Sequence, residues 1–294
     1  MASPAAEIDI DVALVRALLA EQHPDLAHLA VTAVASGWDN DIFRLGDELT
    51  ARLPRRLMAS ALVLNEQRWL PLLAPRLPLA VPVPVRVGVP SEALSYPWSW
   101  TVGPWLPGSP LEQSPPDHLA DAAMALGAFL AALHRPAPAD APANPYRGVP
   151  LADRADRFER GLGDLGDTVD GPALRRLWHE LVATPAWPGP PLWVHGDVHP
   201  LNLLVHEGRL TAVIDFGDLT AGDPASDLAG GWTFLPTAER AVFRAAAGMH
   251  GLVDDDTWSR ARGWALALGV AVANGDDRVA AFGRRALRAA LEDV

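Results

Sequence analysis

The sequence predicts an α+β fold of two lobes: a small N-terminal lobe with an antiparallel β-sheet and one helix, and a larger, mostly helical C-terminal lobe. Short strand-like runs separated by Gly, Asp and Asn fill the first part of the chain, whereas apolar residues at steps of three and four dominate the second half. The chain has 294 residues, 49% of them hydrophobic, and so exceeds the commonest size of a single domain. We expect lobes at 1–102 and 109–294, joined by a hinge at 103–108.

The small lobe is expected to hold five strands and one helix. The predicted strands are 28–34, 41–45, 49–53, 81–85 and 98–102. Gly and Asn suit the tight turns at 36–40 and 46–48. Apolar residues share one face of the predicted helix at 59–73. The Gly and Pro residues of 103–108 then end regular structure.

The larger lobe is expected to consist mainly of helices, because apolar residues recur there with helical spacing. The predicted helices are 118–134, 153–162, 173–183, 237–250, 255–273 and 276–292. Gly and Asp residues indicate a loop at 163–171, and a Pro/Ala stretch at 136–145 indicates a second loop. The segment between the third and fourth helices carries the polar motif described next.

Three polar residues, Asp197, Asn202 and Asp215, have the chemistry that phosphoryl transfer requires. One carboxylate can hold and deprotonate an attacking hydroxyl, while a carboxamide and a second carboxylate can hold Mg²⁺ against nucleotide phosphates. Two short strands at 203–206 and 210–214 are expected to form a hairpin with a two-residue turn at Gly208-Arg209. This register would place Asn202 directly opposite Asp215, where one divalent cation could bridge them.

Two motifs follow one another in a specific order. The first runs from His195-Gly196-Asp197 to Asn202, and the second is Ile214-Asp215-Phe216-Gly217-Asp218 followed by Gly222-Asp223-Pro224. In them the chain resembles the aminoglycoside phosphotransferase family of the protein-kinase-like superfamily, which also includes macrolide, choline and fructosamine kinases. The resemblance implies a bilobal protein-kinase-like fold and an ATP- or GTP-dependent enzyme that requires Mg²⁺. It assigns Asp197 to catalysis and Asn202 and Asp215 to the metal.

The cation that holds the nucleotide phosphates must be an arginine. Kinase-like folds place a lysine on the third strand, but all 24 Lys and Arg residues of this chain are Arg. Arg52, at the end of the third predicted strand, is the candidate by position and resemblance, with Arg55 and Arg56 as competing choices. Glu66 is polar on an otherwise apolar helix face, and the resemblance implies that it orients Arg52.

The resemblance also implies where the rest of the nucleotide binds. Ser36 and Gly37 fall where a kinase-like fold places its phosphate-covering loop, although the glycine-rich pattern G-x-G-x-x-G is absent from this segment. Backbone groups around Thr101, Gly103 and Trp105 are expected to hydrogen-bond the purine, and the preference for ATP or GTP stays open.

The acceptor is expected to be a small molecule with a hydroxyl group, most simply an antibiotic whose phosphorylation gives resistance. A cationic aminoglycoside or related antibiotic comes first, and a macrolide next. Acidic residues of the larger lobe could hold a cationic substrate; the candidates are Asp153, Asp156, Asp223 and Asp227. A metabolic kinase acting on choline, a sugar or an amino alcohol is the alternative.

Composition narrows the partners and the compartment. The net charge of −12 argues against nucleic acid as a partner, and the chain has no cysteine for disulfides or thiolate metal sites. The N-terminus lacks the basic and apolar regions of a secretory signal, and no apolar run could cross a membrane. We therefore expect a cytoplasmic protein with no membrane partner, as a monomer or, alternatively, a dimer.

Two other functions compete with the kinase. His195, Asp197 and His199 alternate along one segment and could point to one side of it, so a metal-dependent hydrolase is the first. That alternative leaves Asn202 and Asp215 unexplained. A catalytically inactive nucleotide-binding protein is the second, and the presence of all three chemical residues disfavours it.

Overall fold

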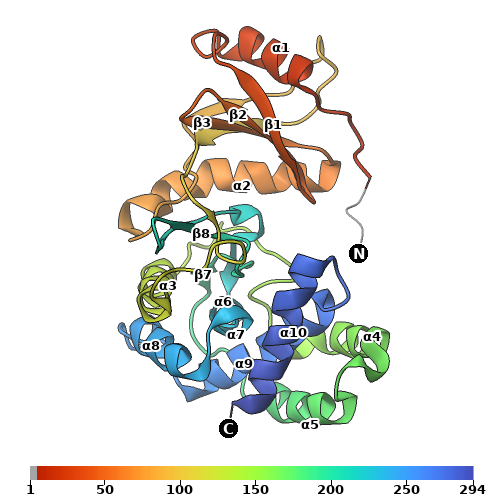
Figure 1. Ribbon diagram of the computed structural model, residues 1–294, viewed down its shortest axis with the longest axis vertical. Coiled ribbons are helices and arrows are strands. Elements are labelled where there is room, and N and C mark those ends of the chain that lie inside the picture. The colour runs from red at the N-terminus through yellow and green to blue at the C-terminus, as the bar shows by residue number, and fades with distance from the viewer. Residues whose placement is uncertain (1–4, 294) are drawn as a thin grey trace.

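The smaller lobe of the protein is stacked on the larger one, with helix α2 between the sheet and the larger lobe (Figure 1). This computed structural model describes residues 5–293. Residues 1–4, part of the segment expected to carry no secretory signal and of the expected 1–102 lobe, lie outside it, as does residue 294. Most buried apolar residues form two clusters. One lies in the smaller lobe, and the other fills the larger lobe and extends to Trp69, Leu70 and Leu73 of the smaller one. The predicted α+β class and the order of the lobes are confirmed.

A five-stranded antiparallel sheet forms the smaller lobe, with the order β1-β2-β3-β5-β4. The strands are β1 (Val31–Ser36), β2 (Asn40–Leu45), β3 (Leu49–Pro54), β4 (Arg86–Gly88) and β5 (Trp100–Pro104). The first three lie within three residues of the predicted bounds, because their turns were marked by Gly and Asn. Phe43, Leu45, Ala51 and Leu53 pack with Trp98, Trp100 and Val102 in the lobe's core.

Between residues 5 and 102 the smaller lobe contains two α-helices, whereas one helix was expected. Helix α1 (Val12–Gln22) begins at Asp11, whose side chain accepts a hydrogen bond from the Leu14 amide at 2.8 Å. It buries Val15, Leu18 and Leu19 against the sheet's apolar core. An Asp immediately before apolar residues at steps of three and four is a helix-start signal that the sequence did offer.

The strand expected at 81–85 is also wrong. Pro82 and Pro84 have no amide hydrogen and cannot donate to a sheet, so the segment is irregular and β4 begins only at Arg86. Gly103 and Pro104, the first two residues of the expected hinge at 103–108, still belong to β5 and pair with β3. The hinge itself stays a prediction.

Helix α2 (Leu57–Leu73) carries the contacts between the lobes. Its buried face includes Glu66 and Trp69, and the Trp69 ring lies 5.0 Å from the ring of Trp193 in the larger lobe. The 3₁₀ helix η1 (Ala74–Arg76) follows directly. The predicted helix at 59–73 is confirmed, with two more residues at its start.

The larger lobe is mostly helical, as predicted. Its helices are α3 (Leu119–Leu133), η2 (Leu151–Arg154), α4 (Ala155–Leu165), η3 (Gly166–Thr168), α5 (Gly171–Val182), η4 (Phe216–Asp218), α6 (Ala225–Leu228), α7 (Gly231–Phe234), α8 (Thr237–Ala247), α9 (Asp255–Val272) and α10 (Asp277–Glu292). The loop expected at 163–171 is largely helical, because α4 continues to Leu165 and η3 follows it. Within residues 5–293, no helix is both long and apolar enough to span a bilayer.

Two small sheets in the larger lobe frame the polar motifs. One contains β6 (Ser109–Pro110), β8 (Leu203–His206) and β9 (Arg209–Val213), and the other pairs β7 (Leu192–Val194) with β10 (Thr220–Gly222). The loop from β7 to β8 carries Asp197 and Asn202, while the segment between β9 and β10 carries Asp215. The sheets thus bring the two halves of the motif to one region.

Candidate active site

The loop that carries Asp197 is anchored by a buried carboxylate. Both oxygens of Asp227 accept hydrogen bonds at 2.8 Å, one from the His195 amide and the other from the Gly196 amide. The His134 imidazole contacts the same carboxylate at 3.0 Å. Asp227 has 0% exposed surface, so the expectation that it meets the substrate was wrong: its carboxylate holds the loop.

Replacing Asp227 with Ala should therefore destabilise the fold. Two loop amides and His134 would lose a buried acceptor, and we expect the free energy of unfolding to fall by about 3–5 kcal/mol. Chemical denaturation measures this change. Asp227→Asn, which keeps one acceptor oxygen, should lose less. A loss below about 1 kcal/mol for Asp227→Ala would contradict the anchoring role.

Gly196 lets the loop turn towards Asp218. Its φ is +89°, a backbone conformation that residues other than glycine rarely adopt. A Cβ atom here would lie 2.6 Å from the Asp218 carbonyl oxygen, closer than atoms can approach. The absence of a side chain at this position therefore lets the Asp197 loop and the Asp215 segment meet.

Three side chains hold the Asp197 carboxylate. Arg147 donates to Oδ1 at 3.0 Å, and His199 and Asn202 lie 3.1 Å and 3.2 Å from Oδ2. Burial works against ionisation, but the charges and hydrogen bond of His199 and then Arg147 outweigh it and hold the pKa of Asp197 well below its ordinary value. Asp197 is therefore an ionised, oriented carboxylate.

The expected hairpin register was wrong at two places. The turn residues are Glu207 and Gly208, both with positive φ, so His206 pairs with Arg209. The register then shifts beyond Val205, which leaves Thr211 as an extra residue. The Ile214 amide consequently donates to the backbone carbonyl of Asn202 at 2.9 Å, and Asp215 lies one position beyond this pair.

Asp215 takes a left-handed conformation, with φ 65° and ψ 69°, just before η4. Its side chain is half exposed, and its Oδ1 accepts a hydrogen bond from Arg52 at 3.3 Å. Arg52 also donates to Glu66 at 2.8 Å. The predicted pairing of Arg52 with Glu66 is present, and Arg52 additionally links α2 to the Asp215 segment.

The ion pair between Arg52 and Glu66 is almost fully enclosed, with exposed side-chain fractions of 15% and 4%. Burial raises the pKa of Glu66 above its ordinary value, and the Arg52 charge counteracts that rise only in part. Burial also disfavours the cationic form of Arg52, but Glu66 and Asp215 together raise its pKa further. The guanidinium is therefore fixed in place by two carboxylates.

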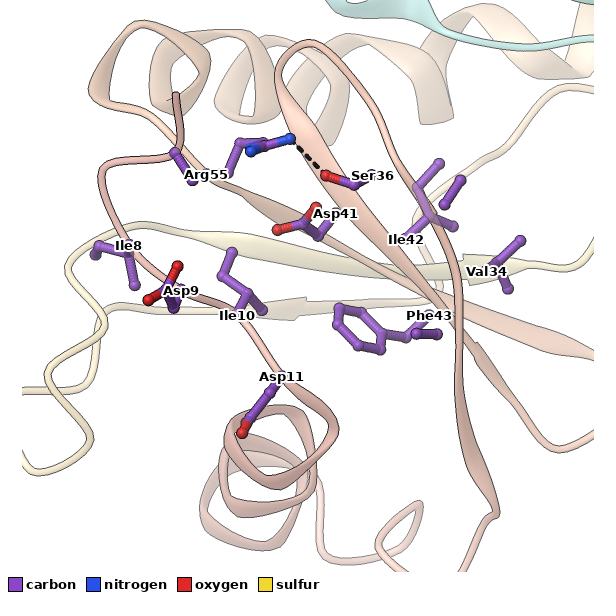
Figure 2. A pocket seen from close by; sticks show the side chains of 13 residues that line it. Ile8, Asp9, Ile10, Asp11, Val34, Ser36, Asp41, Ile42, Phe43 and Arg55 are labelled. Atoms are coloured by element: carbon purple, nitrogen blue, oxygen red, sulfur yellow. Dashed lines mark hydrogen bonds between the residues drawn. The ribbon is translucent and has the colours of Figure 1, made fainter. Parts of the chain in front are cut away.

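Arg55 and Arg56, the competing phosphate cations, hold the turn after β1. Arg55 donates to the Ser36 hydroxyl and to the Gly37 carbonyl, and Arg56 pairs with Asp39. Figure 2 shows the contact between Arg55 and Ser36 at the edge of a hollow of about 450 Å³. This hollow lies between the segment before α1 and strands β1 and β2, and Asp197 is not among its lining residues.

All three residues expected at the purine make contacts within the protein. The Trp105 amide donates to the Glu48 carbonyl at 2.7 Å, so this donor is taken. The Thr101 hydroxyl accepts from Gln67 at 3.1 Å, and the Thr101 backbone faces Arg52 in the sheet. Gly103 pairs with Thr50.

The acidic residues proposed for a cationic acceptor fall into two groups. Asp223 is buried and paired with Arg260 at 2.7 Å, and it accepts from the Ala225 amide at the start of α6. The substrate assignment of Asp223 was therefore wrong. Asp153 and Asp156 are exposed near the start of α4 and stay predictions.

The model of the phosphotransferase enzyme family (APH) matches residues 30–264, from just before β1 to within α9. The chain belongs to this family. Its fold is therefore that of the protein-kinase-like superfamily, and it is a phosphotransferase. No curated protein matches the chain significantly in sequence.

Solved structures support the fold assignment across the whole chain. The GDP complex of wild-type aminoglycoside 2'-phosphotransferase-IIIa has a TM-score of 0.69 and 18% identity over 96% of this chain and 99% of that one. The apoenzyme of macrolide 2'-phosphotransferase MphH from Brachybacterium faecium has a TM-score of 0.60 and 25% identity, covering 95% and 97%. The streptomycin–ATP–APH(2'')-IIa complex has a TM-score of 0.58 and 16% identity, covering 94% and 95%.

The geometry of this phosphotransferase does not favour the hydrolase alternative. The His195 ring contacts the Ile214 carbonyl through Nε2 at 3.0 Å and accepts from the Asp197 amide through Nδ1. Both ring nitrogens thus contact backbone groups of the protein. In the part of the chain from residue 5 to residue 293, no group of three or more His, Asp or Glu side chains is arranged to hold a metal ion.

Sequence reasoning missed two residues of the site, Arg147 and Asp218. Arg147 bonds Asp218 at 2.9 Å as well as Asp197, and Asn144 donates to Asp218 at 2.9 Å. Asp218 belongs to the quoted metal motif, so a signal was available for it. Arg147 lies fifty positions before Asp197 in an irregular segment, and no motif marks it.

Proposed function

We propose that this phosphotransferase moves the γ-phosphate of ATP or GTP to a hydroxyl group of a small molecule, with Mg²⁺ as cofactor. The observation that carries the proposal is the contact between Arg52 and Asp215, at 3.3 Å, in a chain that also brings Asn202 against Asp197. These contacts support phosphate binding by Arg52, metal binding by Asn202 and Asp215, and catalysis by Asp197. Solved neighbours that hold GDP or ATP are consistent with a nucleotide donor.

The donor atoms fit Mg²⁺. Asn202 uses its Nδ2 group to donate to Asp197, which leaves its carbonyl oxygen for a cation, and the Asp215 carboxylate is half exposed. Two protein oxygens suffice because Mg²⁺ takes its other ligands from phosphates and water. When bound, the ion would neutralise negative charge on the phosphates.

Each protein group then has a defined task. Arg52 would hold the nucleotide phosphates through its planar set of donors, with Glu66 fixing its position. Asp197 would orient the acceptor hydroxyl and receive its proton as the new bond to phosphorus forms and the bond to the departing nucleoside diphosphate breaks. Because such transition states are loose, positioning and charge neutralisation supply most of the rate.

The two lobes would bind different substrates. We assign nucleotide binding to residues 1–102, with Ser36 and Gly37 over the phosphates and Thr101 and Gly103 near the purine. Residues 103–108 would form the connection about which the lobes adjust, and 109–294 would bind the acceptor and carry Asp197.

Antibiotics are the first acceptors to test, because solved neighbours are aminoglycoside and macrolide phosphotransferases. A polycationic aminoglycoside is the less favoured of the two. Asp223 and Asp227 are buried in protein contacts, while the guanidinium of Arg147 lies against Asp197. A metabolic small-molecule kinase is the second candidate, and this arginine beside the acceptor position favours it.

A donor and acceptor screen tests the proposed function. The purified full-length protein would be mixed with ATP or GTP, with Mg²⁺ or with EDTA, and with aminoglycosides, macrolides and small metabolic alcohols. We expect transfer to one class of hydroxyl, dependent on Mg²⁺, with the phosphate located by mass spectrometry. Nucleotide binding without transfer to any member of the panel would favour the catalytically inactive alternative.

Glu66→Gln should raise the KM for the nucleotide by about tenfold, because Arg52 would lose a charged partner inside the protein. Steady-state kinetics at varied MgATP measures the change. Glu159→Gln is the matched control, since Glu159 pairs with Arg175 at 2.9 Å on the exposed surface of α4 and α5. An unchanged KM in Glu66→Gln would remove Glu66 from nucleotide binding.

A further inference from the structure

Among residues 5–293, one buried arginine, Arg154, has no acidic hydrogen-bond partner and has Arg147 among its electrostatic neighbours. Arg154 ends η2, and only 7% of its surface is exposed. Its guanidinium lies 5.8 Å from the centre of the Tyr146 ring and 5.7 Å from that of the Trp264 ring. Within residues 5–293 its side chain forms no hydrogen bond or ion pair, and its Nε is buried without a partner.

The surroundings of Arg154 favour an anion. A buried charge without a hydrogen-bonded counterion is unfavourable, so natural proteins rarely keep one without a ligand. The indole Nε1 of Trp264 is a second buried donor that lacks an acceptor in the described part of the chain. Burial and the charges of Arg157 and Arg147 lower the pKa of Arg154, and Tyr146 and Asp153 counteract them only in part.

Arg157 and Arg147 link the surroundings of Arg154 to the proposed catalytic carboxylate. Arg157 lies 5.9 Å from the Tyr146 ring, on the same aromatic side chain as Arg154. Arg147 follows Tyr146 in sequence and bonds Asp197 at 3.0 Å. An anionic group held here would thus lie on the acceptor side of Asp197.

We propose that Arg154, supported by Arg157 and Tyr146, forms an oxyanion subsite that binds a carboxylate or phosphate group of the acceptor. This inference rests on the proposed function and narrows it to hydroxyl compounds that carry a negative group. Arg presents several donors in one plane, which matches the two oxygens of a carboxylate or phosphate. Arg147 would then release Asp197 Oδ1 as the acceptor hydroxyl arrives.

Binding of inorganic phosphate tests the subsite without knowledge of the acceptor. Calorimetric titration at constant ionic strength would compare wild type with Arg154→Met, and with Arg160→Met as the control. Arg160 is an exposed arginine of α4 that forms no ion pair in the described chain. Phosphate can also bind near Arg52, so the informative quantity is the affinity lost in Arg154→Met but kept in Arg160→Met. We expect a weakening of about tenfold or more.

Arg157→Met keeps the test valid if Arg154→Met does not fold, because Arg157 is exposed. It should weaken phosphate binding in the same direction by a smaller factor. Equal phosphate affinity in wild type and the variants would overturn the subsite and indicate that water satisfies Arg154 and Trp264.

A second experiment tests whether the subsite binds an anionic group of the acceptor or only a free anion. Hydroxyl compounds would be assayed in matched pairs, each carboxylate or phosphate against its neutral ester or parent alcohol. We expect wild type to prefer the anionic member, and Arg154→Met to raise its KM about tenfold while kcat changes less. If active wild type phosphorylated the anionic and the neutral member equally well, the oxyanion subsite would be overturned but the proposed function would stand. If wild type transferred phosphate to no compound, the proposed function itself would be contradicted.

Discussion

Asp197→Asn should lower kcat for phosphoryl transfer by roughly 10²–10⁴-fold, while the affinity for MgATP changes little. The amide would keep the size of the side chain but could not take the proton of the acceptor hydroxyl. Arg147 and His199, which lie 3.0 Å and 3.1 Å from the Asp197 oxygens, would also lose their charged partner. Steady-state kinetics with a mass-spectrometric product assay measures the loss.

The matched control for Asp197→Asn is Asp167→Asn, because Asp167 is exposed in η3 far along the chain from the motif. This control should behave as wild type. Circular dichroism and the melting temperature would show whether Asp197→Asn is folded. A folded Asp197→Asn protein that turns over at the wild-type rate would remove Asp197 from catalysis.

Asp215→Asn should give the second large effect, a loss of about 10²–10³-fold in kcat/KM for MgATP. The half-exposed carboxylate would no longer supply a charged oxygen ligand to Mg²⁺, and Arg52 would lose its contact at 3.3 Å. Calorimetric titrations with ATP, in Mg²⁺ and then in EDTA, separate the two losses. We expect the Mg²⁺-dependent part of the affinity to fall.

Asp39→Asn is a useful comparison for Asp215→Asn, because Asp39 is also paired with an arginine of the smaller lobe, Arg56. Loss of that pair should loosen the turn after β1 without removing a metal ligand. If Asp215→Asn kept full Mg²⁺-dependent activity, the assignment of Asp215 to the metal would be wrong.

The sequence allowed the local parts of the site to be predicted. Asp197 and Asn202 lie in one short loop, and their chemistry restricts what can replace them. Glu66 was visible because a carboxylate interrupts an apolar helix face, and its pairing with Arg52 followed from the resemblance to a known family. Strands with Gly and Asn turns, such as β2 and β3, were also placed well.

Contacts between distant segments could not be predicted in the same way. Asp227 lies in the short helix α6, and only the folded chain shows that its oxygens accept hydrogen bonds from the amides of His195 and Gly196. Arg147 approaches Asp197 from an irregular segment fifty residues earlier. The extra residue Thr211 changed the hairpin register because sheet geometry, and not turn composition alone, decides where a bulge forms.

The proposed reaction and the proposed choice of acceptor depend on different residues. The reaction rests on Asp197, Asn202 and Asp215, whereas acceptor choice rests on the arginines beside them. An acceptor that carries a negative group would join these two regions, because Arg147 contacts Asp197 and lies near Arg154.

Direct transfer of the γ-phosphoryl group is the most decisive measurement. ATP labelled with ¹⁸O at the nonbridging γ-oxygens would be incubated with Mg²⁺, the best acceptor from the screen and either wild type or Asp197→Asn. We expect the wild-type product to carry all the labelled oxygens in one phosphoryl group attached to an acceptor hydroxyl, and Asp197→Asn to form this product at least about a hundredfold more slowly. Label found only in free phosphate, or equal product formation by both proteins, would contradict this expectation.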